Sequence, residues 1–304
     1  MRAPLPAGLN MGPRHHWAPI GFQKDLMTLT MEDVEALHQK YYTPTNMVGV
    51  LVGSISPAQA KNILEQYFGR TPFRPAPPPH KVPDAAFQGE QRKTISYPAQ
   101  PMLAIGFHKP KAPDSADYNF DILDTILCEG RTGRLYQHLV QEKKVASEVF
   151  CSNGFPGSRF DNMFLVFALP NQKVELADLE KMVEQELADM QHDIQPKELE
   201  KVRKSVLYDY LWGLADPMEY VERLGVAQAV VGDWRYVTTY SKKIEAITKE
   251  DLEKTARKYF VPENRVVLYR LKGSITGAHV APSTGEAGWS LPLSLALRAT
   301  GGGK

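Results

Sequence analysis

Few side chains of the types that bind metals stand close together in this sequence. His15 and His16 are adjacent in a Pro-rich segment, and His138 and Glu142 lie one turn apart on an expected helix. Adjacent histidines in such a loop favour a surface position over a ligand role. His138 and Glu142 would need a third partner to hold a metal, so we interpret them as a solvated pair. These residues therefore predict no metal site.

A short Gly-containing segment, Glu-Gly-Arg-Thr-Gly-Arg over 129–134, invites comparison with a phosphate-binding loop. It lacks the Lys-Ser/Thr ending of such loops and does not follow an expected strand. Its glycines instead predict a tight turn between two helices, with Arg134 opening the second. If a loop of this chain faces a peptide or a partner unit, this one is the candidate, through Glu129, Arg131, Thr132 and Arg134.

Two cysteines, Cys128 and Cys151, are too few for a zinc–cysteine cluster or a disulfide framework. Each follows an apolar pair, which favours buried structural thiols. A single bridge between them stays open at this stage, and so does the redox compartment.

Composition limits the class of protein. The 304 residues are 43% apolar and 23% charged, as in an ordinary globular protein, and 36 basic against 35 acidic residues leave a net charge of +1. No basic footprint points to nucleic acid. No run approaches the roughly 18–20 apolar residues of a membrane-spanning helix. The segment from Met1 to Pro19 contains no apolar core of a signal peptide.

An internal repeat is the strongest organisational signal. Leu29–Asn46 is echoed without a gap by Ile247–Asn264, so that every position keeps the same offset from its counterpart. Both copies have a Thr N-cap, acids in the first turn, an amphipathic helix ending in an aromatic pair, a Pro stop and an Asn. An apolar strand is expected next, at 47–52 and at 265–271. We interpret the repeat as a duplication.

The spacing of the copies predicts an incomplete first unit. If one unit is as long as the stretch from Leu29 to Ile247 and this element closes it, the first unit should begin well before Met1. We therefore expect a remnant of the first repeat at 1–70, a Pro-rich linker at 71–89, a complete second repeat at 90–273 and a flexible tail at 274–304.

The second repeat alternates strand hairpins with helix pairs. Strands are expected at about 93–97, 102–107, 146–152 and 163–169, and helices at about 116–127, 134–143, 176–191, 196–212 and 217–231. This order predicts an α+β fold, with helices on one face of a mainly antiparallel sheet. Within the helix at 196–212, Tyr208, Tyr210 and Trp212 are interpreted as core or interface residues, and Lys197, Lys201 and Lys204 as a solvated face.

Several segments in order resemble the pitrilysin/insulinase-like zinc metallopeptidases, a family that includes mitochondrial processing peptidase subunits. They are His16–Gly21, Leu29–Asn46, Gly130–Tyr136 and Leu139–Lys143, and the resemblance runs from about residue 16 to 271. It implies duplicated α+β units that enclose a chamber for unfolded peptides. It also implies a zinc ion held in the first unit by an inverted His-x-x-Glu-His helix and a later Glu, with the Glu of the helix activating a zinc-bound water.

The zinc motif is not in this sequence. Its histidines never stand four positions apart; they are His15, His16, His38, His80, His108, His138, His192 and His279. In the family the ligands precede the segment that matches His16–Gly21. An Arg and a Tyr that some relatives use from the second unit are replaced here by Val140 and Ser147. We therefore assign no catalytic and no metal-binding residue, and expect the isolated chain to be inactive and to carry no cofactor.

The resemblance implies two functions. The first is the C-terminal part of a zinc endopeptidase, forming the non-catalytic half of a peptide-degrading chamber. The alternative is an inactive partner or scaffold subunit that pairs with a separate zinc-bearing subunit. A weaker third possibility is a peptide-binding module that uses a sheet edge. The expected partners are an unfolded polypeptide substrate and the missing first repeat or a zinc-bearing homologue, in a homo- or heterodimer. Bacterial relatives suggest a periplasmic or cell-envelope location.

Overall fold

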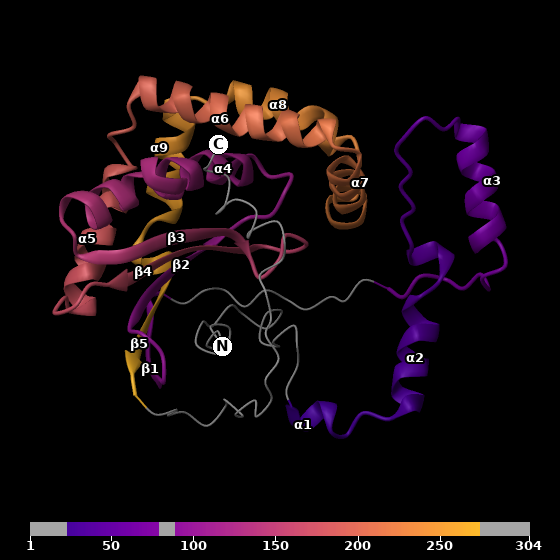
Figure 1. Cartoon of the computed structure of the whole chain (residues 1–304), viewed down its shortest axis with the longest axis horizontal. Helices are drawn as coiled ribbons and strands as arrows, with labels where there is room; N and C mark the ends of the chain where they lie inside the picture. The colour runs from indigo at the N-terminus through magenta and orange to yellow at the C-terminus, as the bar shows by residue number, and fades with distance from the viewer. Residues whose placement is uncertain (1–22, 79–88, 274–304) are drawn as a thin grey trace, which may run out of the picture.

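The computed structural model describes residues 23–78 and 89–273 (Figure 1). The first range forms a short helical unit. Its elements are α1 (Gln23–Leu26), α2 (Met31–Tyr41), the 3₁₀ turn η2 (Pro44–Asn46) and α3 (Pro57–Phe68). Neither α2 nor α3 contains a buried residue.

The second range builds one five-stranded sheet, which confirms the predicted fold class. Its strands follow the order β1-β5-β2-β4-β3 across the sheet. Only β1 and β5 run parallel, and the other three pairings are antiparallel. The strands are β1 (Gln91–Tyr97), β2 (Met102–Lys109), β3 (Ala146–Phe155), β4 (Asn162–Pro170) and β5 (Arg265–Lys272).

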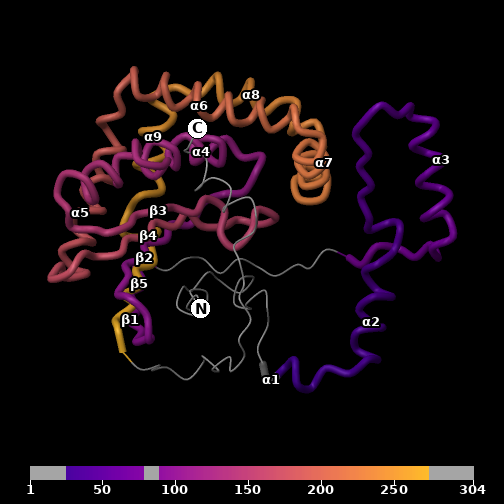
Figure 2. Tube along the Cα trace, in the orientation of Figure 1, coloured from indigo at the N-terminus to yellow at the C-terminus, as the bar shows by residue number. Residues whose placement is uncertain are grey.

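Helices cover one face of this sheet in two tiers (Figure 1). The tier on the sheet is α4 (Ser115–Cys128), α5 (Leu176–Asp189) and α9 (Lys249–Tyr259). The outer tier is α6 (Pro196–Ala215) and α8 (Tyr236–Ala246), with α7 (Pro217–Val226) extending from the end of α6. Figure 2 shows the course of the chain between these elements. The connecting segments include the 3₁₀ turns η3 (Gly130–Thr132) and η6 (Pro262–Asn264) and the π-helices η4 (Tyr136–Glu142) and η5 (Ala227–Val231).

Alternation along the strands separates two apolar clusters. Leu103, Ile105 and Phe107 of β2 join the main core beneath the helices, whereas Met102 and Ala104 belong to a smaller cluster on the opposite face. On that opposite face β2 also carries a glycine at 106, where an added Cβ would lie 2.6 Å from the side chains of two neighbouring β4 residues. The close approach of those side chains therefore favours glycine there.

The repeat seen in the sequence recurs in the local structure. Thr30 and Asp33 form a reciprocal capping box at the start of α2, as Thr248 and Asp251 do at the start of α9. Asn46 Nδ2 donates to the Tyr41 carbonyl over 2.9 Å, and the equivalent bond in the second copy is 3.0 Å long.

The prediction of a strand at 47–52 is wrong. This stretch has no strand partner among residues 23–78 and 89–273, whereas β5, its counterpart, lies between β1 and β2. A strand is defined by its pairing, and the apolar pattern alone does not supply a partner.

The cysteines also differ from the interpretation as free buried thiols. Cys128 at the end of α4 and Cys151 in the middle of β3 form a disulfide with a Cα–Cα distance of 5.8 Å, and both residues are only half-buried. Their proximity arises because α4 packs along β3, which the sequence spacing could not reveal.

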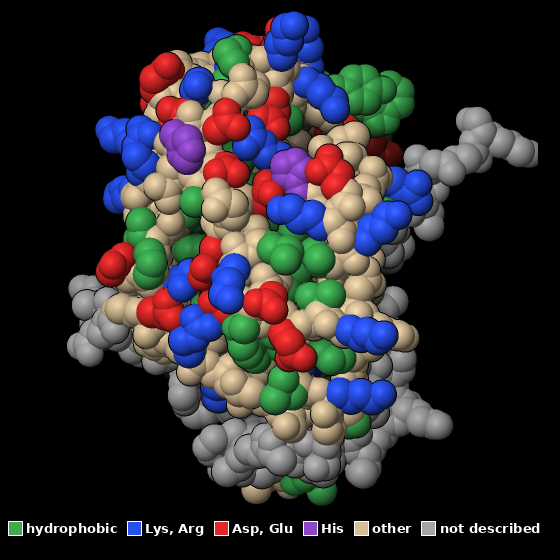
Figure 3. Space-filling model, turned by 90° about the vertical axis from the view of Figure 1, so that its left-hand side faces the viewer, with side chains coloured by type: hydrophobic (Ala, Val, Ile, Leu, Met, Phe, Trp, Pro, Cys, Tyr) green, Lys and Arg blue, Asp and Glu red, His purple; other side chains and the backbone are tan. Residues whose placement is uncertain are grey.

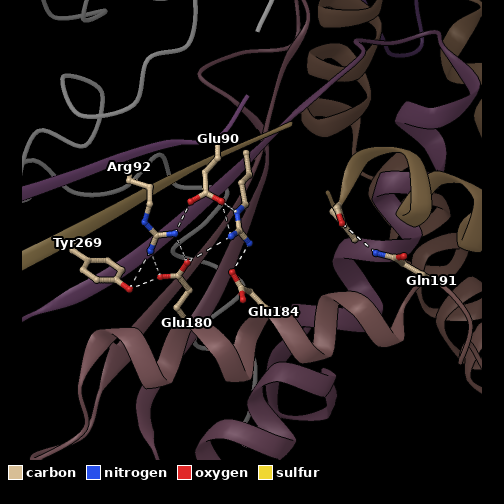
Figure 4. A network of polar contacts seen from close by, with 8 residues as sticks. Glu90, Arg92, Glu180, Glu184, Gln191 and Tyr269 are labelled. Atoms are coloured by element: carbon tan, nitrogen blue, oxygen red, sulfur yellow. Dashed lines mark hydrogen bonds and ion pairs between the residues drawn. The ribbon is translucent and has the colours of Figure 1, made fainter. Parts of the chain in front are cut away.

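A charged network fastens α5 to the β1–β5 edge of the sheet (Figure 4). Arg92 of β1 donates to both carboxylate oxygens of Glu180 over 2.8 and 2.6 Å, and the Tyr269 hydroxyl donates to the same carboxylate. Arg265 of β5 bridges Glu90 and Glu184. Burial opposes ionisation of Glu180, but the hydrogen bonds from Arg92 and Tyr269 outweigh it, so the pKa of Glu180 is lowered. Elsewhere on the face shown in Figure 3, acidic and basic side chains intersperse without a single-sign patch.

We expect Glu180→Gln to lower the free energy of unfolding by about 2–3 kcal/mol at pH 7, because it removes the buried carboxylate of this ion pair and leaves the Arg92 guanidinium with Glu90 alone. A carboxyl with a lowered pKa stabilises above its unfolded pKa and loses that effect as pH falls. The difference between wild type and variant should therefore shrink as pH falls below about 4.5. Urea unfolding at pH 7 and pH 3.5 tests this, with the exposed Glu200→Gln as a control that should change stability by less than about 0.5 kcal/mol.

Candidate peptide- or partner-facing loop

The loop over 129–134 connects α4 to η4, as predicted. Gly130 has a φ of +53°, a left-handed conformation that favours glycine. A Cβ on Gly133 would lie 2.8 Å from the Leu127 carbonyl oxygen, so the chain turns back tightly over the end of α4. The two glycines therefore make the turn, and they do not form a phosphate cradle.

The four candidate residues of this loop differ in their surroundings. Arg131 and Thr132 are exposed, and Glu129 is half-buried. Arg134 is tied to α6: its Nε donates to Glu198 over 2.8 Å and its Nη2 donates to the Asp193 carbonyl over 2.6 Å. The hydrogen bond with Glu198 raises the pKa of Arg134 above its ordinary value. Arg134 thus anchors the loop, while the exposed Arg131 and Thr132 can face another molecule.

Two cavities border the loop and share Thr125 and Glu129. One, of about 200 Å³, runs between the end of α4 and α6 and includes Thr132 and Lys201. The other, of about 140 Å³, has four acidic side chains among its nine lining residues, which are Asp121, Asp124, Thr125, Glu129, Val206, Asp209, Tyr210, Arg223 and Tyr240. The loop therefore lies at the rim of a polar groove over α4.

Asp121 is a strongly perturbed carboxyl in this groove. Asn153 Nδ2 and the Tyr240 hydroxyl each donate to it over 2.8 Å. Burial, with a smaller effect of the charge on Asp117, raises its pKa to about 7, although the two donors oppose the shift. Burial also raises the pKa of Tyr210 to about 12 and the pKa of Tyr240 further. Asp121 is therefore a carboxyl that titrates near neutrality.

Sequence reasoning did not single out the acidic side of the groove. A signal was present, because Asp117, Asp121, Asp124 and Cys128 recur at helical spacing on an otherwise apolar helix. In the structure Asp117 forms an ion pair with the buried Lys109, and Asp121 accepts a hydrogen bond from the Tyr240 hydroxyl.

The other sequence candidates are placed as follows. His138 Nδ1 lies 2.7 Å from the buried Glu186 carboxylate and does not pair with Glu142. In η4 the Lys143 N–H bonds the His138 carbonyl, five residues back, and this wider turn removes the alignment of residues four apart. His15 and His16 lie outside the described residues.

The aromatic residues of α6 divide between core and surface. Tyr210 is buried and donates to the Val237 carbonyl over 2.6 Å. Tyr208 and Trp212 are exposed and stack on each other with ring centroids 6.0 Å apart. Lys197, Lys201 and Lys204 are exposed, as expected.

The described residues do not fit a His-x-x-Glu-His zinc centre. Within 23–78 and 89–273, the one group of three side chains with ligand atoms close enough for a metal is Asp124, Cys128 and Cys151, which contains no imidazole. We therefore derive no catalytic step through zinc in this chain.

We expect Asp121→Asn to change how stability depends on pH. The folded-state pKa of Asp121, about 7, exceeds the unfolded value near 4. The native state then binds more protons between these values, so the free energy of unfolding falls as pH rises from 4 to 7. The variant should remove about 1–3 kcal/mol of that fall.

Urea unfolding of both proteins from pH 4 to pH 8 measures this change. Exposed Asp178→Asn serves as the control and should keep the wild-type slope. Parallel pH profiles for wild type and Asp121→Asn would show that this carboxyl ionises normally.

Comparisons with known proteins identify the family to which this sequence and fold belong. Residues 28–206 match the family model described as the peptidase M16 inactive domain. Zinc protease PqqE of Helicobacter pylori is 24% identical over 81% of this chain, and the chain spans 56% of its length.

Two solved structures show the same fold. A peptidase M16 inactive domain from Pseudomonas fluorescens has a TM-score of 0.75 at 19% identity, over 88% of this chain and 65% of that one. The first half of the periplasmic protease PqqL from Escherichia coli has a TM-score of 0.69 at 16% identity, over 88% of this chain and 60% of that one. Since the family model covers more than half of the sequence, the chain belongs to the peptidase M16 inactive domain family.

Proposed function

We propose that this chain forms the non-catalytic half of a peptide-degrading chamber in a zinc endopeptidase. A unit that bears the His-x-x-Glu-His helix, on the same polypeptide or on a separate subunit, would hold the zinc and hydrolyse the peptide. The present chain would supply the opposite wall and help to retain an unfolded polypeptide. The family assignment and the lack of a fitting zinc site among the described residues support this division of labour.

The observation that carries the proposal is the opposite burial of two equivalent elements. Val34 and Tyr42 are 50% and 62% exposed. Their counterparts in the second copy of the repeat, Leu252 and Phe260, are 0% and 5% exposed, because α9 packs on α4 and the sheet. The first copy has the same caps and length as the second but no cover among the described residues. An apolar helical face of this kind calls for a packing partner.

This difference supports the division of the chain predicted from the sequence. We propose that residues 1–70 are the C-terminal remnant of a first repeat, and that the front of this repeat belongs to the zinc-bearing unit. Residues 71–89 would link the two repeats, and 90–273 would form the complete second repeat. The five strands of the described ranges all lie between Gln91 and Lys272, inside the second unit. Residues 274–304, which lie outside the described ranges, are proposed to be a tail.

We also propose that the 129–134 loop faces the substrate or the partner. Arg131 and Thr132 are among its exposed residues, and Thr132 lines the cavity between α4 and α6, along which a peptide could lie. The outer edge of β3 lies beside α4 and offers a second contact for an extended peptide. No helix in the described ranges is long and apolar enough to cross a membrane. We propose a periplasmic or cell-envelope location, as for the Escherichia coli protease of similar fold.

Substitution by aspartate should affect the stability of the chain very differently at the equivalent positions Val34 and Leu252. Leu252→Asp buries an unpaired charge and should cost at least about 3 kcal/mol of stability. Val34→Asp should change the stability of the isolated chain by less than about 0.5 kcal/mol, because Val34 is half-exposed. Urea unfolding of the two variants measures both effects.

Val34→Asp should nevertheless prevent pairing with the zinc-bearing unit. Co-purification of the coexpressed units tests this, with Ala36→Asp as the matched control, since its counterpart Lys254 is exposed on α9. Equal recovery of the zinc-bearing unit by Val34→Asp and wild type would contradict the proposed packing face.

The isolated chain should show no chelator-sensitive cleavage of a casein-like substrate, since it lacks both the imidazole ligands and the glutamate general base. Activity should appear when the zinc-bearing unit is added. Cleavage by the chain alone that is lost with chelator and restored by zinc would overturn the proposed non-catalytic role.

A further inference from the structure

Three metal-ligand side chains meet where α4 reaches β3. Asp124 and Cys128 stand four residues apart on α4, so they lie on the same helical face, and Cys151 faces them from β3. A carboxylate oxygen of Asp124 and both sulfur atoms lie within 4.8 Å of one another. All three residues are half-buried, and the two sulfurs form the disulfide.

We propose that reduction of the Cys128–Cys151 disulfide converts this group into a binding site for a thiophilic divalent cation of the Zn²⁺ class. A dithiol reductant supplies two electrons, the S–S bond breaks, two thiols form, and the reductant becomes a disulfide. The cation then binds both sulfurs and the Asp124 carboxylate, and the two thiol protons pass to solvent.

The donor set suits such a cation. Thiolates are the ligands that select Zn²⁺ over harder ions, and a carboxylate oxygen is a common third ligand. Two thiolates and a carboxylate this close repel one another, and a divalent cation relieves that repulsion. Asp124 also lines the cavity of about 140 Å³, so the carboxylate side of the group borders a space large enough for a water molecule.

The surrounding structure holds the three residues together without the bridge. Ile122, Leu123, Ile126 and Leu127 fix α4 in the main core, and Val149 places β3 in the same core. Asn153 of β3 also donates to Asp121 of α4 over 2.8 Å, one polar contact between the two elements that reduction does not break. No hydrolytic role is assigned to this site.

The test is Co²⁺ titration of the full chain after reduction with dithiothreitol and anaerobic desalting. We expect one Co²⁺ per chain, with the charge-transfer absorption of thiolate–Co²⁺ bonds, and displacement of that Co²⁺ by Zn²⁺. The oxidised chain and the reduced Cys128→Ser, Cys151→Ser double variant should give no such absorption. Asp124→Asn should weaken Co²⁺ binding at least about tenfold, and the exposed Asp178→Asn should bind as wild type.

Three outcomes would overturn the proposal. One is the absence of thiolate absorption from the reduced wild type. Another is wild-type affinity in Asp124→Asn, which would exclude the carboxylate as a ligand. The third is loss of the folded state on reduction, followed by circular dichroism, because the site requires α4 and β3 to stay packed. None of these readouts depends on peptidase activity, so the proposed function stands or fails separately.

Discussion

The packing of α4 between the sheet and the outer helices is the interaction on which the rest of the structure depends. Eight of its fourteen residues are buried, and the Phe120 ring lies 5.5–5.8 Å from three other aromatic rings, two of them at the end of α9. Burial of a large apolar side chain contributes about 1.5–3 kcal/mol, so this helix supplies a large part of the core. The loop, the groove, the disulfide and Asp121 are all placed by it.

The duplicated element separates what local sequence determines from what tertiary packing determines. In both copies the capping box starts an eleven-residue helix and Asn closes the turn. Burial then differs completely, since only the second copy meets α4 and the strands on either side of β5. Asn264 illustrates the difference, because it donates to the His108 carbonyl of β2 as well as to its own helix. Helix formation is thus local, whereas the strand that follows exists only where neighbouring strands pair with it.

Much of the second unit could be predicted from its sequence. The continuous apolar runs of β2 and β4, Pro at the first turn of α6 and α7, and the Pro stops after the repeated helices each have a local physical cause. The contacts of the candidate site could not be predicted in this way. Arg134 pairs with Glu198 and His138 with Glu186, both distant along the chain, and no local pattern reports such contacts. Asp121 carried a local signal as a polar residue on an apolar helix, but its two donors come from β3 and α8.

Two aspartates on the polar face of α4, Asp121 and Asp124, have different surroundings and different chemistry. Burial raises the pKa of Asp121 to about 7 even though the Asn153 amide and the Tyr240 hydroxyl donate to its carboxylate and oppose the shift. A protonated carboxyl is a poor metal ligand. One turn further on, Asp124 faces two sulfur atoms, which accept a cation only after they are reduced. With the proposed cation site at Asp124, the same helix would respond to proton concentration at one position and to redox state at the other.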